Sequence, residues 1–460
     1  MAEEMTKSTK DEIEALRDAL SDGAFGTEGM AEENDAVADE SLVNDFISMF
    51  GVEGDTPLKG HDWVINLPSS IKQYKHGTKN PLYGLVREEM ESIYILDYKQ
   101  WRKSQYYLGE LTVSDSEKAK KTDELFELMR HGHKPTVNYP YNLKVSGSVV
   151  NGDMQIQMER VSSDGETMEV IPVRVKQYDT VTNLFSRNTG LLESSAMLDK
   201  RAVLVGCGSV GSFVAMQLAR SGVGKFVLCD TDTLEIHNIC RHQCGFDDLG
   251  RYKVDAVKDK ILNINPNAEV ITYRSIIQRV PEDELMPLLG RNTIIIGGGD
   301  NRGSADWACK LAIKTDSTFV STGCWTRAFA GEIFYWASGR NLSCYSCALG
   351  GLIDEDRPES HATYFGSDEE KETLSFEPGI AADIDFVTII AVKLALDLLN
   401  RDNENYTPRV IDYLKQYTWV CNTNNTKIGG PRAAMFPTPL WITNNLTVNK
   451  DAGCPFCGNK

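Results

Sequence analysis

The stretch RAVLVGCGSVGS, residues 201–212, joins a run of apolar residues to three glycines in the spacing Gly-x-Gly-x-x-Gly. This pattern is typical of a buried strand that ends in a tight turn and continues as a helix. Gly206 allows the bend, Gly208 lets the backbone approach a phosphate, and Gly211 lets the helix pack closely against the strand. Backbone amides at the start of the helix, from Ser209 onward, face the anion. The stretch therefore predicts a nucleotide-binding turn.

A second apolar strand, expected over residues 225–229, ends in Asp230, whose carboxylate can accept hydrogen bonds from ribose hydroxyls. An acidic residue about 20 positions beyond the glycines is equally typical of an NAD-binding dehydrogenase. The turn and Asp230 therefore leave an NAD-dependent oxidoreductase and an ATP-binding protein both open.

The polar residues that follow favour a nucleoside triphosphate. Arg241 and Lys253 can neutralise a triphosphate, and Asn238 can bind one of its phosphate oxygens. A third apolar strand, expected over residues 293–296, leads to Asp300. This carboxylate can hold Mg²⁺, which prefers one or two carboxylates together with phosphate oxygens. Neither an NAD-binding site nor a non-catalytic nucleotide-binding scaffold needs this set of residues.

In this order and spacing, the motifs resemble those of the ThiF/MoeB-type superfamily of ATP-dependent adenylating enzymes, which includes the activating enzymes of ubiquitin-like proteins. The resemblance covers roughly residues 183–460 and comprises Gly-x-Gly-x-x-Gly, Asp-x-Asp, Asn-x-x-Arg, Lys and Asp-Asn. It implies ATP and Mg²⁺ as cofactors. The nucleotide-binding residues that it implies are Gly206, Gly208, Ser209, Gly211, Asp230, Asp232, Asn238, Arg241, Lys253, Asp300 and Asn301.

The resemblance also bears on the assembly and on two substitutions. In this superfamily, an arginine just before the Rossmann-like strand reaches the ATP of the other subunit, so Arg187 is expected to act in trans within a homodimer. His242 and Asp306 stand where the family usually has glutamine and arginine. Neither substitution removes an expected phosphate ligand.

Two Cys-x-x-Cys pairs predict a zinc site. Cys344 with Cys347 and Cys454 with Cys457 supply four thiolates, enough for tetrahedral zinc with no open position. The pairs are far apart in the sequence, so the metal is expected to fix the C-terminal segment to the body of the domain. The role is therefore structural, and the resemblance implies the same.

Composition excludes several classes of protein. The net charge of −18 argues against a nucleic-acid-binding protein, which would show a basic face. The sequence shows neither an apolar run long enough to span a bilayer nor a secretory signal at its acidic N-terminus. Eleven cysteines, four of them in Cys-x-x-Cys pairs, indicate thiols and metal in a reducing compartment. We expect a cytoplasmic protein.

The first part of the chain is expected to contain an acidic, partly disordered tail, residues 1–55, and an α+β accessory domain, residues 56–182. In the domain, a helix over residues 116–129 precedes a hairpin at Asn151-Gly152 and a further strand over residues 169–175, which together predict an antiparallel meander. The apolar face of the helix is expected to carry Leu125, Leu128 and Met129. Because no cysteine precedes Cys207, the domain is expected to recruit the substrate or to mediate dimerisation.

The remainder, residues 183–460, is expected to form the adenylation domain. Strands and helices alternate along it, which predicts an α/β fold: a doubly wound, mostly parallel, Rossmann-like sheet with its ligand at the carboxyl ends of the strands. An antiparallel extension is expected to begin near residues 331–337. A polar crossing loop, residues 348–379, leads to a buried helix over residues 380–399.

The sequence leaves three alternatives for a second half-reaction. Activating relatives carry a cysteine that accepts the acyl group as a thioester, and its position by the family's spacing is Ser375. Three hypotheses remain open: adenylation is the final activity, a serine forms an oxyester, or a cysteine elsewhere reacts. The serines are Ser375, then Ser367 and Ser360; the cysteines are Cys324 and Cys421.

The sequence therefore predicts an enzyme that adenylates the C-terminal carboxylate of a ubiquitin-like protein. Acyl transfer to Ser375, in a bacterial ubiquitin-like conjugation pathway with a downstream conjugating protein, would follow. The alternative is a sulfur-carrier-protein or peptide adenylyltransferase, as in ribosomal peptide modification, that stops at the acyl-adenylate. An NAD-dependent oxidoreductase remains the interpretation from a different class.

Overall fold

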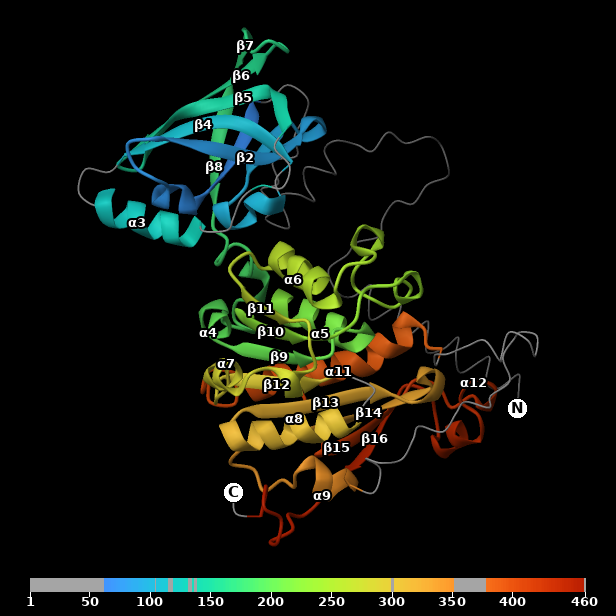
Figure 1. Cartoon of the computed structure of the whole chain (residues 1–460). Coiled ribbons are helices and arrows are strands. Elements are labelled where there is room, and N and C mark those ends of the chain that lie inside the picture. The colour runs from blue at the N-terminus through green and yellow to red at the C-terminus, as the bar shows by residue number, and fades with distance from the viewer. Residues whose placement is uncertain are drawn as a thin grey trace, which may run out of the picture. The chain divides into compact units, whose positions relative to one another are not determined.

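The computed structural model describes residues 62–103, 105–114, 119–130, 135, 139–298, 302–350 and 378–458. The predicted acidic tail, residues 1–55, lies outside them. The described residues form two eight-stranded sheets, each with its own apolar core (Figure 1). None of the described helices combines the length and the apolar character that a membrane span requires.

The first sheet closes on itself. Its strand order is β7-β6-β5-β4-β2-β3-β1-β8, yet only Pro172 separates β7 from β8 in the sequence. The two ends of the order must therefore approach each other, and β8 contacts β6 as well as its partner β1. Its strands are β1 (Trp63–Pro68), β2 (Lys79–Arg87), β3 (Ser92–Ile95), β4 (Tyr106–Ser114), β5 (Tyr139–Val150), β6 (Asp153–Val161), β7 (Thr167–Ile171) and β8 (Val173–Tyr178).

This sheet corrects two predictions. The strand expected over residues 169–175 is two strands, because Pro172 has no N–H to donate to a ladder and marks the change of partner from β6 to β1. The meander is only partly antiparallel, since β4–β5, β1–β3 and β1–β8 are parallel pairs. The hairpin is confirmed: Asn151 and Gly152 have φ of 50° and 95°, as a type I′ turn requires.

The predicted helix is α3 (Ala119–Arg130), and of its predicted buried face only Met129 packs against the core of the first sheet. Leu125 and Leu128 are 45% and 75% exposed, whereas Phe126 is buried. Phe126 lies 5.0 Å from the ring centroid of Tyr74, within a cluster of buried aromatic side chains. The larger apolar area of the phenylalanine explains the rotation, because its burial removes more surface from water than that of a leucine.

The second sheet confirms the predicted architecture. Its order is β11-β10-β9-β12-β13-β14-β15-β16; the first five strands are parallel and the last three form the antiparallel extension. β15, which contains Cys421, was not predicted. The strands are β9 (Arg201–Val205), β10 (Lys225–Cys229), β11 (Glu269–Tyr273), β12 (Thr293–Gly297), β13 (Thr318–Cys324), β14 (Ala330–Trp336), β15 (Tyr417–Cys421) and β16 (Trp441–Leu446).

Helices cover both faces of this sheet (Figure 1). α11 packs on α5 and on β12 to β14, while α8 packs on β12, β13 and α9. The strand order reverses between β9 and β12, and in open α/β sheets the crevice at such a point binds the ligand. The helices of this part are α4 (Ser194–Leu198), α5 (Ser209–Arg220), α6 (Lys253–Ile264), α7 (Glu282–Leu285), α8 (Arg302–Thr315), α9 (Tyr345–Leu349), α11 (Ala381–Leu399) and α12 (Thr426–Gly429).

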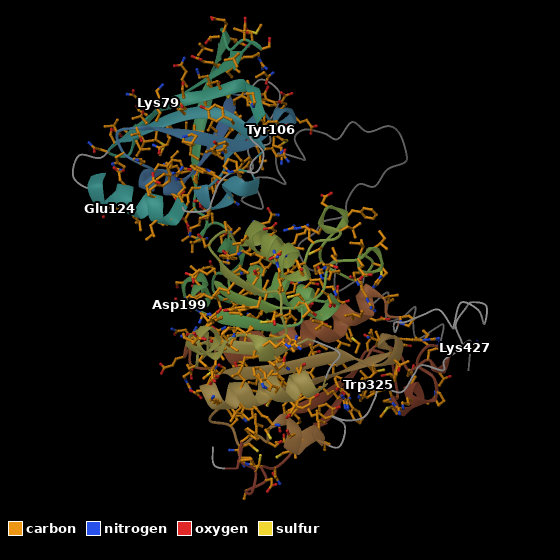
Figure 2. All side chains as sticks on the ribbon, in the orientation of Figure 1. Lys79, Tyr106, Glu124, Asp199, Trp325 and Lys427 are labelled. Atoms are coloured by element: carbon orange, nitrogen blue, oxygen red, sulfur yellow. The ribbon has the colours of Figure 1, made fainter. Side chains whose placement is uncertain are left out.

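A small aromatic cluster supports the far end of the antiparallel extension. Trp325, labelled in Figure 2, packs with Phe329, Trp419 and Phe436, which come from segments on both sides of the crossing loop. Burial of this much aromatic surface fixes the C-terminal strands to the β13–β14 hairpin.

Candidate active site

The glycine turn has the geometry that the sequence predicts. Gly206 has φ of 98°, a conformation that favours glycine, and its N–H donates to the carbonyl of Cys229 at 2.9 Å. A Cβ on Gly211 would lie 2.0 Å from the carbonyl oxygen of Gly206, so only glycine fits there. A Cβ on Gly208 would meet no atom within 4 Å, so the space beside this residue is open to an approaching group.

The turn leads directly into α5, and the start of this helix is a ready anion site. Gly208 is the N-cap residue and makes no side-chain hydrogen bond to the first turn. The amides of the first turn of α5 therefore have no acceptor within the helix. The helix dipole favours an anion as the group that accepts their hydrogen bonds. Gly298, just beyond β12, lies close by, since a Cβ on it would be 3.4 Å from the amide nitrogen of Gly211. The carboxyl ends of β9 and β12 thus meet at the turn, as predicted.

Two side chains hold the backbone of Cys207, in the middle of the turn. Its N–H donates to Asp230 Oδ2 at 2.6 Å, and its carbonyl accepts from His242 Nε2 at 2.7 Å. His242 Nδ1 accepts from the amide of Cys244 at 3.0 Å, so the proton of the neutral ring is on Nε2. Burial lowers the pKa of His242, which favours this neutral form.

This role of His242 was missed from the sequence, which showed only a departure from the family's glutamine. A glutamine side chain, like a neutral imidazole, carries both an N–H donor group and an acceptor atom. The substitution therefore retains the hydrogen-bonding pattern.

The predicted acidic and basic residues meet beside the turn. The second oxygen of Asp230 accepts from the amide of Asp232 at 2.8 Å, and each carboxylate oxygen keeps a further lone pair for a ligand hydroxyl. Lys253, the first residue of α6, is buried, and its Nζ lies 2.9 Å from Asp232 Oδ2. The hydrogen bond from Lys253 lowers the pKa of Asp232. The buried ammonium group of Lys253 can therefore bind an anionic ligand.

Asn238 and Arg241 lie on a short loop beyond β10. The side-chain oxygen of Asn238 accepts from the amide of Glu235 at 3.0 Å and caps the 3₁₀ helix Ile236–Asn238. This side chain can therefore contact a phosphate only through its NH₂ group. Arg241 is half-buried, and its amide donates to the carbonyl of Asn238 at 3.0 Å.

Arg187 is exposed and lies away from the turn of its own chain. It belongs to the 3₁₀ helix Ser186–Asn188, where Asn188 Nδ2 donates to the carbonyl of Arg220 at 3.1 Å. Arg220 is the last residue of α5, and the glycine turn is at the other end of this helix. Twelve residues of helix span about 18 Å, which is longer than an arginine side chain.

Several predicted residues lie outside the described ranges, namely Asp300, Asn301, Ser360, Ser367 and Ser375. The two alternative nucleophiles are described. Cys324 ends β13 and is half-buried, and Cys421 is buried in the aromatic cluster. All eleven cysteines are in the described part of the chain, and none of them forms a disulfide there.

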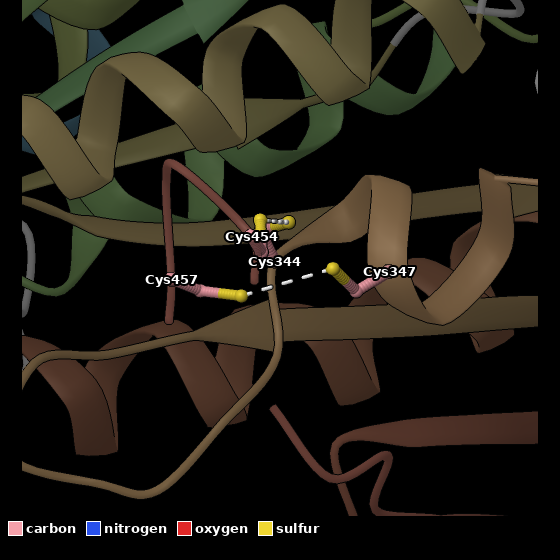
Figure 3. Close-up of side chains that lie close together, drawn as sticks. All are labelled: Cys344, Cys347, Cys454 and Cys457. Carbon is pink, nitrogen blue, oxygen red and sulfur yellow. Dashed lines mark hydrogen bonds between the residues drawn. The ribbon is translucent and has the colours of Figure 1, made fainter. Parts of the chain in front are cut away.

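The four cysteines of the two pairs converge, as Figure 3 shows. Their sulfur atoms lie within 4.8 Å of one another. Cys344 Sγ is 3.7 Å from Cys454 Sγ, and Cys347 Sγ is 3.8 Å from Cys457 Sγ. Tetrahedral zinc with Zn–S bonds of about 2.3 Å places its sulfurs about 3.8 Å apart, so the thiols fit this ion.

Both cysteine pairs are also attached to α8. Asp306, which replaces the family's arginine, accepts a hydrogen bond from Ser346 of the first pair and forms an ion pair with Lys310 at 2.5 Å. Lys310 lies over the ring of Phe456 of the second pair, 4.9 Å from its centroid. Asp306 therefore supports the cysteine cluster.

Residues 182–426, more than half of the chain, match the ThiF family. The chain belongs to the ThiF family. The ubiquitin-like modifier-activating enzyme 5 of Caenorhabditis elegans is 27% identical over 168 residues, which cover 34% of this chain and 39% of that protein. The molybdopterin-synthase adenylyltransferase of Salmonella typhimurium is 28% identical over 172 residues, which cover 35% of this chain and 63% of that protein.

The match thus spans about two fifths of the first relative's length and less than two thirds of the second's. Among solved structures, E. coli MccB in complex with MccA-N7isoASN is similar to this chain. The TM-score is 0.41 at 16% identity, with 58% of this chain and 69% of that chain covered.

Proposed function

We propose that this chain uses MgATP to adenylate the C-terminal carboxylate of a ubiquitin-like or sulfur-carrier protein. The observation that supports the proposal most directly is the glycine turn around Cys207. The N–H groups at the start of α5 have no acceptor within the helix, Asp230 binds the N–H of Cys207, and Lys253 is a buried cation paired with Asp232. Membership of the ThiF family and the names of the two relatives support the same activity.

In the proposed reaction, one oxygen of the substrate carboxylate attacks the α-phosphorus of ATP. A bond forms between this oxygen and phosphorus, and the bond to the bridging oxygen breaks, so pyrophosphate leaves with the electron pair. The carboxylate is already ionised, so no general base is needed. The protein contributes position and positive charge.

The predicted charged residues have separate roles in this scheme. Lys253 and Arg241 offset the charge that develops on pyrophosphate, while Asp230 accepts the ribose hydroxyls. Asp300 would hold Mg²⁺, whose positive charge would help to offset the negative charge of the phosphates. Asp232 is paired with Lys253 in the structure. When ATP binds, the ammonium group of Lys253 leaves Asp232 and pairs with the phosphates.

A homodimer completes the site in this proposal. Arg187 lies at the end of α5 opposite the turn, which supports a contact with the nucleotide of the partner subunit. Four cysteine thiolates hold a structural zinc ion in each subunit.

A protein substrate has a plausible docking surface beside the antiparallel extension. A groove of about 810 Å³ there has a mainly apolar lining. Its residues include Tyr413, Trp419, Phe436, Trp441 and Ile442. Exposed apolar surface of this kind favours a protein partner, here the apolar face of the ubiquitin-like protein.

The second half-reaction is proposed as acyl transfer to Ser375. Its hydroxyl oxygen attacks the carbonyl carbon of the acyl-adenylate, an oxyester forms, AMP leaves, and the hydroxyl proton passes to solvent. In a bacterial conjugation pathway, a downstream protein then accepts the acyl group.

ATP–pyrophosphate exchange tests the first step. We expect exchange only when a ubiquitin-like or sulfur-carrier protein encoded beside this chain, or a peptide, supplies the right carboxylate, and we expect Asp300→Ala to abolish it. Exchange that occurs with a short peptide and with no carrier protein would indicate that the enzyme is a peptide adenylyltransferase. Exchange that survives in Asp300→Ala would show that the magnesium assignment is wrong.

Intact-protein mass spectrometry tests the second step. An adduct that resists thiol reductant, breaks in hydroxylamine and is absent from Ser375→Ala would indicate the oxyester. Adenylate formation without an adduct would mean that the enzyme stops at activation.

A further inference from the structure

The apolar groove beside the antiparallel extension contains a single charged side chain. Of the ten described residues that line it, only Lys393 of α11 carries a charge. Lys393 is also the only exposed residue between Ile390 and Asn400. Its ammonium group forms no ion pair with any residue in the described ranges. A protein that binds in this groove therefore meets one positive charge that the described part of the chain does not neutralise.

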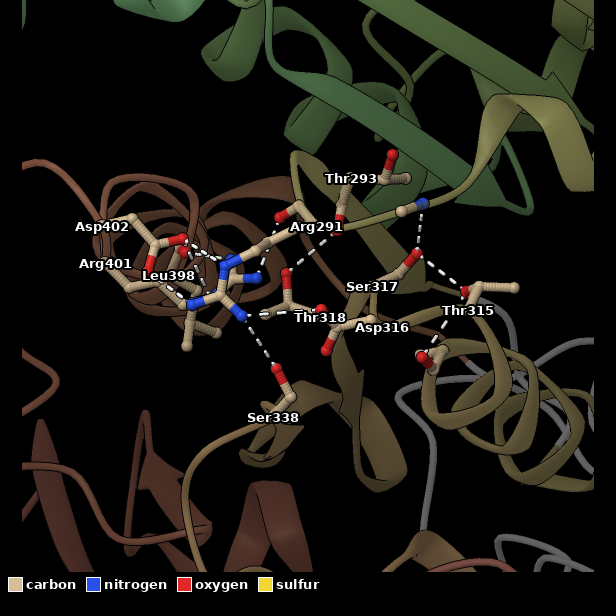
Figure 4. A network of polar contacts seen from close by, with 12 residues as sticks. Arg291, Thr293, Thr315, Asp316, Ser317, Thr318, Ser338, Leu398, Arg401 and Asp402 are labelled. Atoms are coloured by element: carbon tan, nitrogen blue, oxygen red, sulfur yellow. Dashed lines mark hydrogen bonds and ion pairs between the residues drawn. The ribbon is translucent and has the colours of Figure 1, made fainter. Parts of the chain in front are cut away.

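The helix that carries Lys393 is held in place along its length and at its end. Twelve of the nineteen residues of α11 are buried. Just beyond the helix, Arg291 binds Asp402 through two hydrogen bonds of 2.9 and 2.6 Å, and Arg401 Nη2 donates to the carbonyl of Arg291 at 2.9 Å (Figure 4). These contacts attach the end of α11 to the segment before β12. The backbone of Lys393 is therefore fixed before any partner binds.

A buried carboxylate one turn beyond Lys393 fixes a wall of the groove. Asp397 is 1% exposed. It accepts hydrogen bonds of 2.7 to 3.0 Å from the Tyr406 hydroxyl and from the amides of Arg409, Val410 and Ile411. The carbonyl of Val410 accepts in turn from the amides of Tyr413 and Leu414, both at 3.0 Å. All three of these last residues line the groove, so this wall is formed before binding, which lowers the entropy cost of association.

The charge of Lys393 restricts which surfaces can bind in the groove. A partner that covers the ammonium group removes water from it, and this desolvation is costly unless an anion replaces the water. A carboxylate on the partner supplies that anion. An apolar surface without one leaves the charge uncompensated, so the groove discriminates against it.

We propose that Lys393 is a specificity-determining residue for the protein substrate: it selects a ubiquitin-like or sulfur-carrier protein, the carrier, that presents an Asp or Glu carboxylate beside the apolar patch bound in the groove. This inference rests on the proposed function, in which the groove binds the carrier. Lys393 has no role in the adenylation step itself.

The test is Lys393→Glu, in the full-length protein. The probe is the carrier that supports ATP–pyrophosphate exchange by the wild type. We expect the KM for this carrier to rise about tenfold or more, because like charges then face each other, and the KM for ATP to stay unchanged. The side chain is exposed, so we expect a wild-type melting temperature.

A matched control lies in the segment that leads to β15. Lys415 is also exposed, but it does not line the groove. Lys415→Glu changes the net charge of the chain by the same amount, so it reports any general repulsion of an acidic carrier. We expect this variant to retain the wild-type KM for the carrier. An equal rise in both variants would overturn the inference, as would an unchanged KM in Lys393→Glu.

A charge exchange identifies the partner of Lys393. Each exposed Asp or Glu beside the apolar patch of the carrier is replaced by Lys, one at a time. We expect one of these carrier variants to have a raised KM with the wild-type enzyme and a restored KM with Lys393→Glu. Absence of such a variant would overturn the contact with a carboxylate. If no carrier supports exchange by the wild type, the proposed function is wrong, and the inference falls with it.

Discussion

Two glycines of the turn make different demands, and their alanine variants should separate folding from ligand binding. In Gly211→Ala, the new Cβ would lie 2.0 Å from the carbonyl oxygen of Gly206, at least 1.0 Å inside the 3.0 Å that real Cβ contacts observe. The obstacle is backbone, and it cannot rotate away. In Gly208→Ala, the Cβ meets nothing within 4 Å and φ is −72°, which alanine adopts without strain.

The expected magnitudes follow from this geometry. Overpacking of this kind costs about 1–3 kcal/mol, so we expect Gly211→Ala to lower the melting temperature by about 3–10 °C. Gly208→Ala loses only some N-cap preference, about 0.5–1 kcal/mol. Its methyl group, however, occupies the space through which a phosphate approaches the amides. A lost charge-assisted hydrogen bond is worth about 1.5–3 kcal/mol, so ATP affinity should fall about 10- to 100-fold.

Thermal unfolding and calorimetric titration with MgATP measure the two effects separately. Gly245→Ala is the matched control, because this glycine has φ of −122°, lies in open space and is outside the turn. Wild-type ATP affinity in Gly208→Ala would refute the placement of phosphate at the turn. A wild-type melting temperature in Gly211→Ala would refute the close packing of α5 on β9.

Three further predictions address the side chains. Lys253→Met should lower kcat/KM for ATP–pyrophosphate exchange about 100-fold or more, since it removes the buried cation beside the phosphates; a change below threefold would contradict this role. His242 has a lowered pKa, so its contribution to stability is complete above its ordinary pKa of about 6.5 and is lost as the pH falls toward the folded value. The melting temperature of the wild type should therefore fall relative to that of His242→Gln between pH 7.5 and 5.5. Parallel curves of melting temperature against pH for the two proteins would refute this contribution of His242. Cys454→Ser should lower the zinc content measured by atomic absorption and the melting temperature by about 5 °C or more, and an unchanged zinc content would refute the four-thiolate site.

The second sheet was predictable from the sequence because its signals are local. Apolar runs such as residues 293–296 have no solvent-facing alternation, which is typical of parallel strands covered on both faces, and glycines mark where they end. β15 was missed because Tyr417–Cys421 lies among polar segments whose pairing with β14 depends on residues about 85 positions away. No local pattern carries that information.

The first sheet shows the limit of local patterns more clearly. The hairpin at Asn151-Gly152 was found because its turn chemistry is contained in two residues. The closure of the sheet through Pro172 was not, since proline predicts only that a ladder stops and not which strand pairs next. The buried face of α3 was misjudged for a related reason. Phe126 is buried by Tyr74 and Trp101, which lie 52 and 25 positions before it in the sequence.

The candidate site divides in the same way. The predicted ligand-binding residues Asp230 and Lys253 could be selected from the sequence, because Asp230 directly follows an apolar strand and Lys253 fits the order of motifs in the family that the chain resembles. The residues that hold the backbone are not visible, because their partners are peptide groups. His242 appeared only as a departure from the family, yet it binds the carbonyl of Cys207 while Asp230 binds the N–H of the same residue. Three glycines make the turn possible, and these two side chains set the direction of its amides. Phosphate affinity should therefore depend on His242 and Asp230 even though one of them offers the ligand no contact of its own.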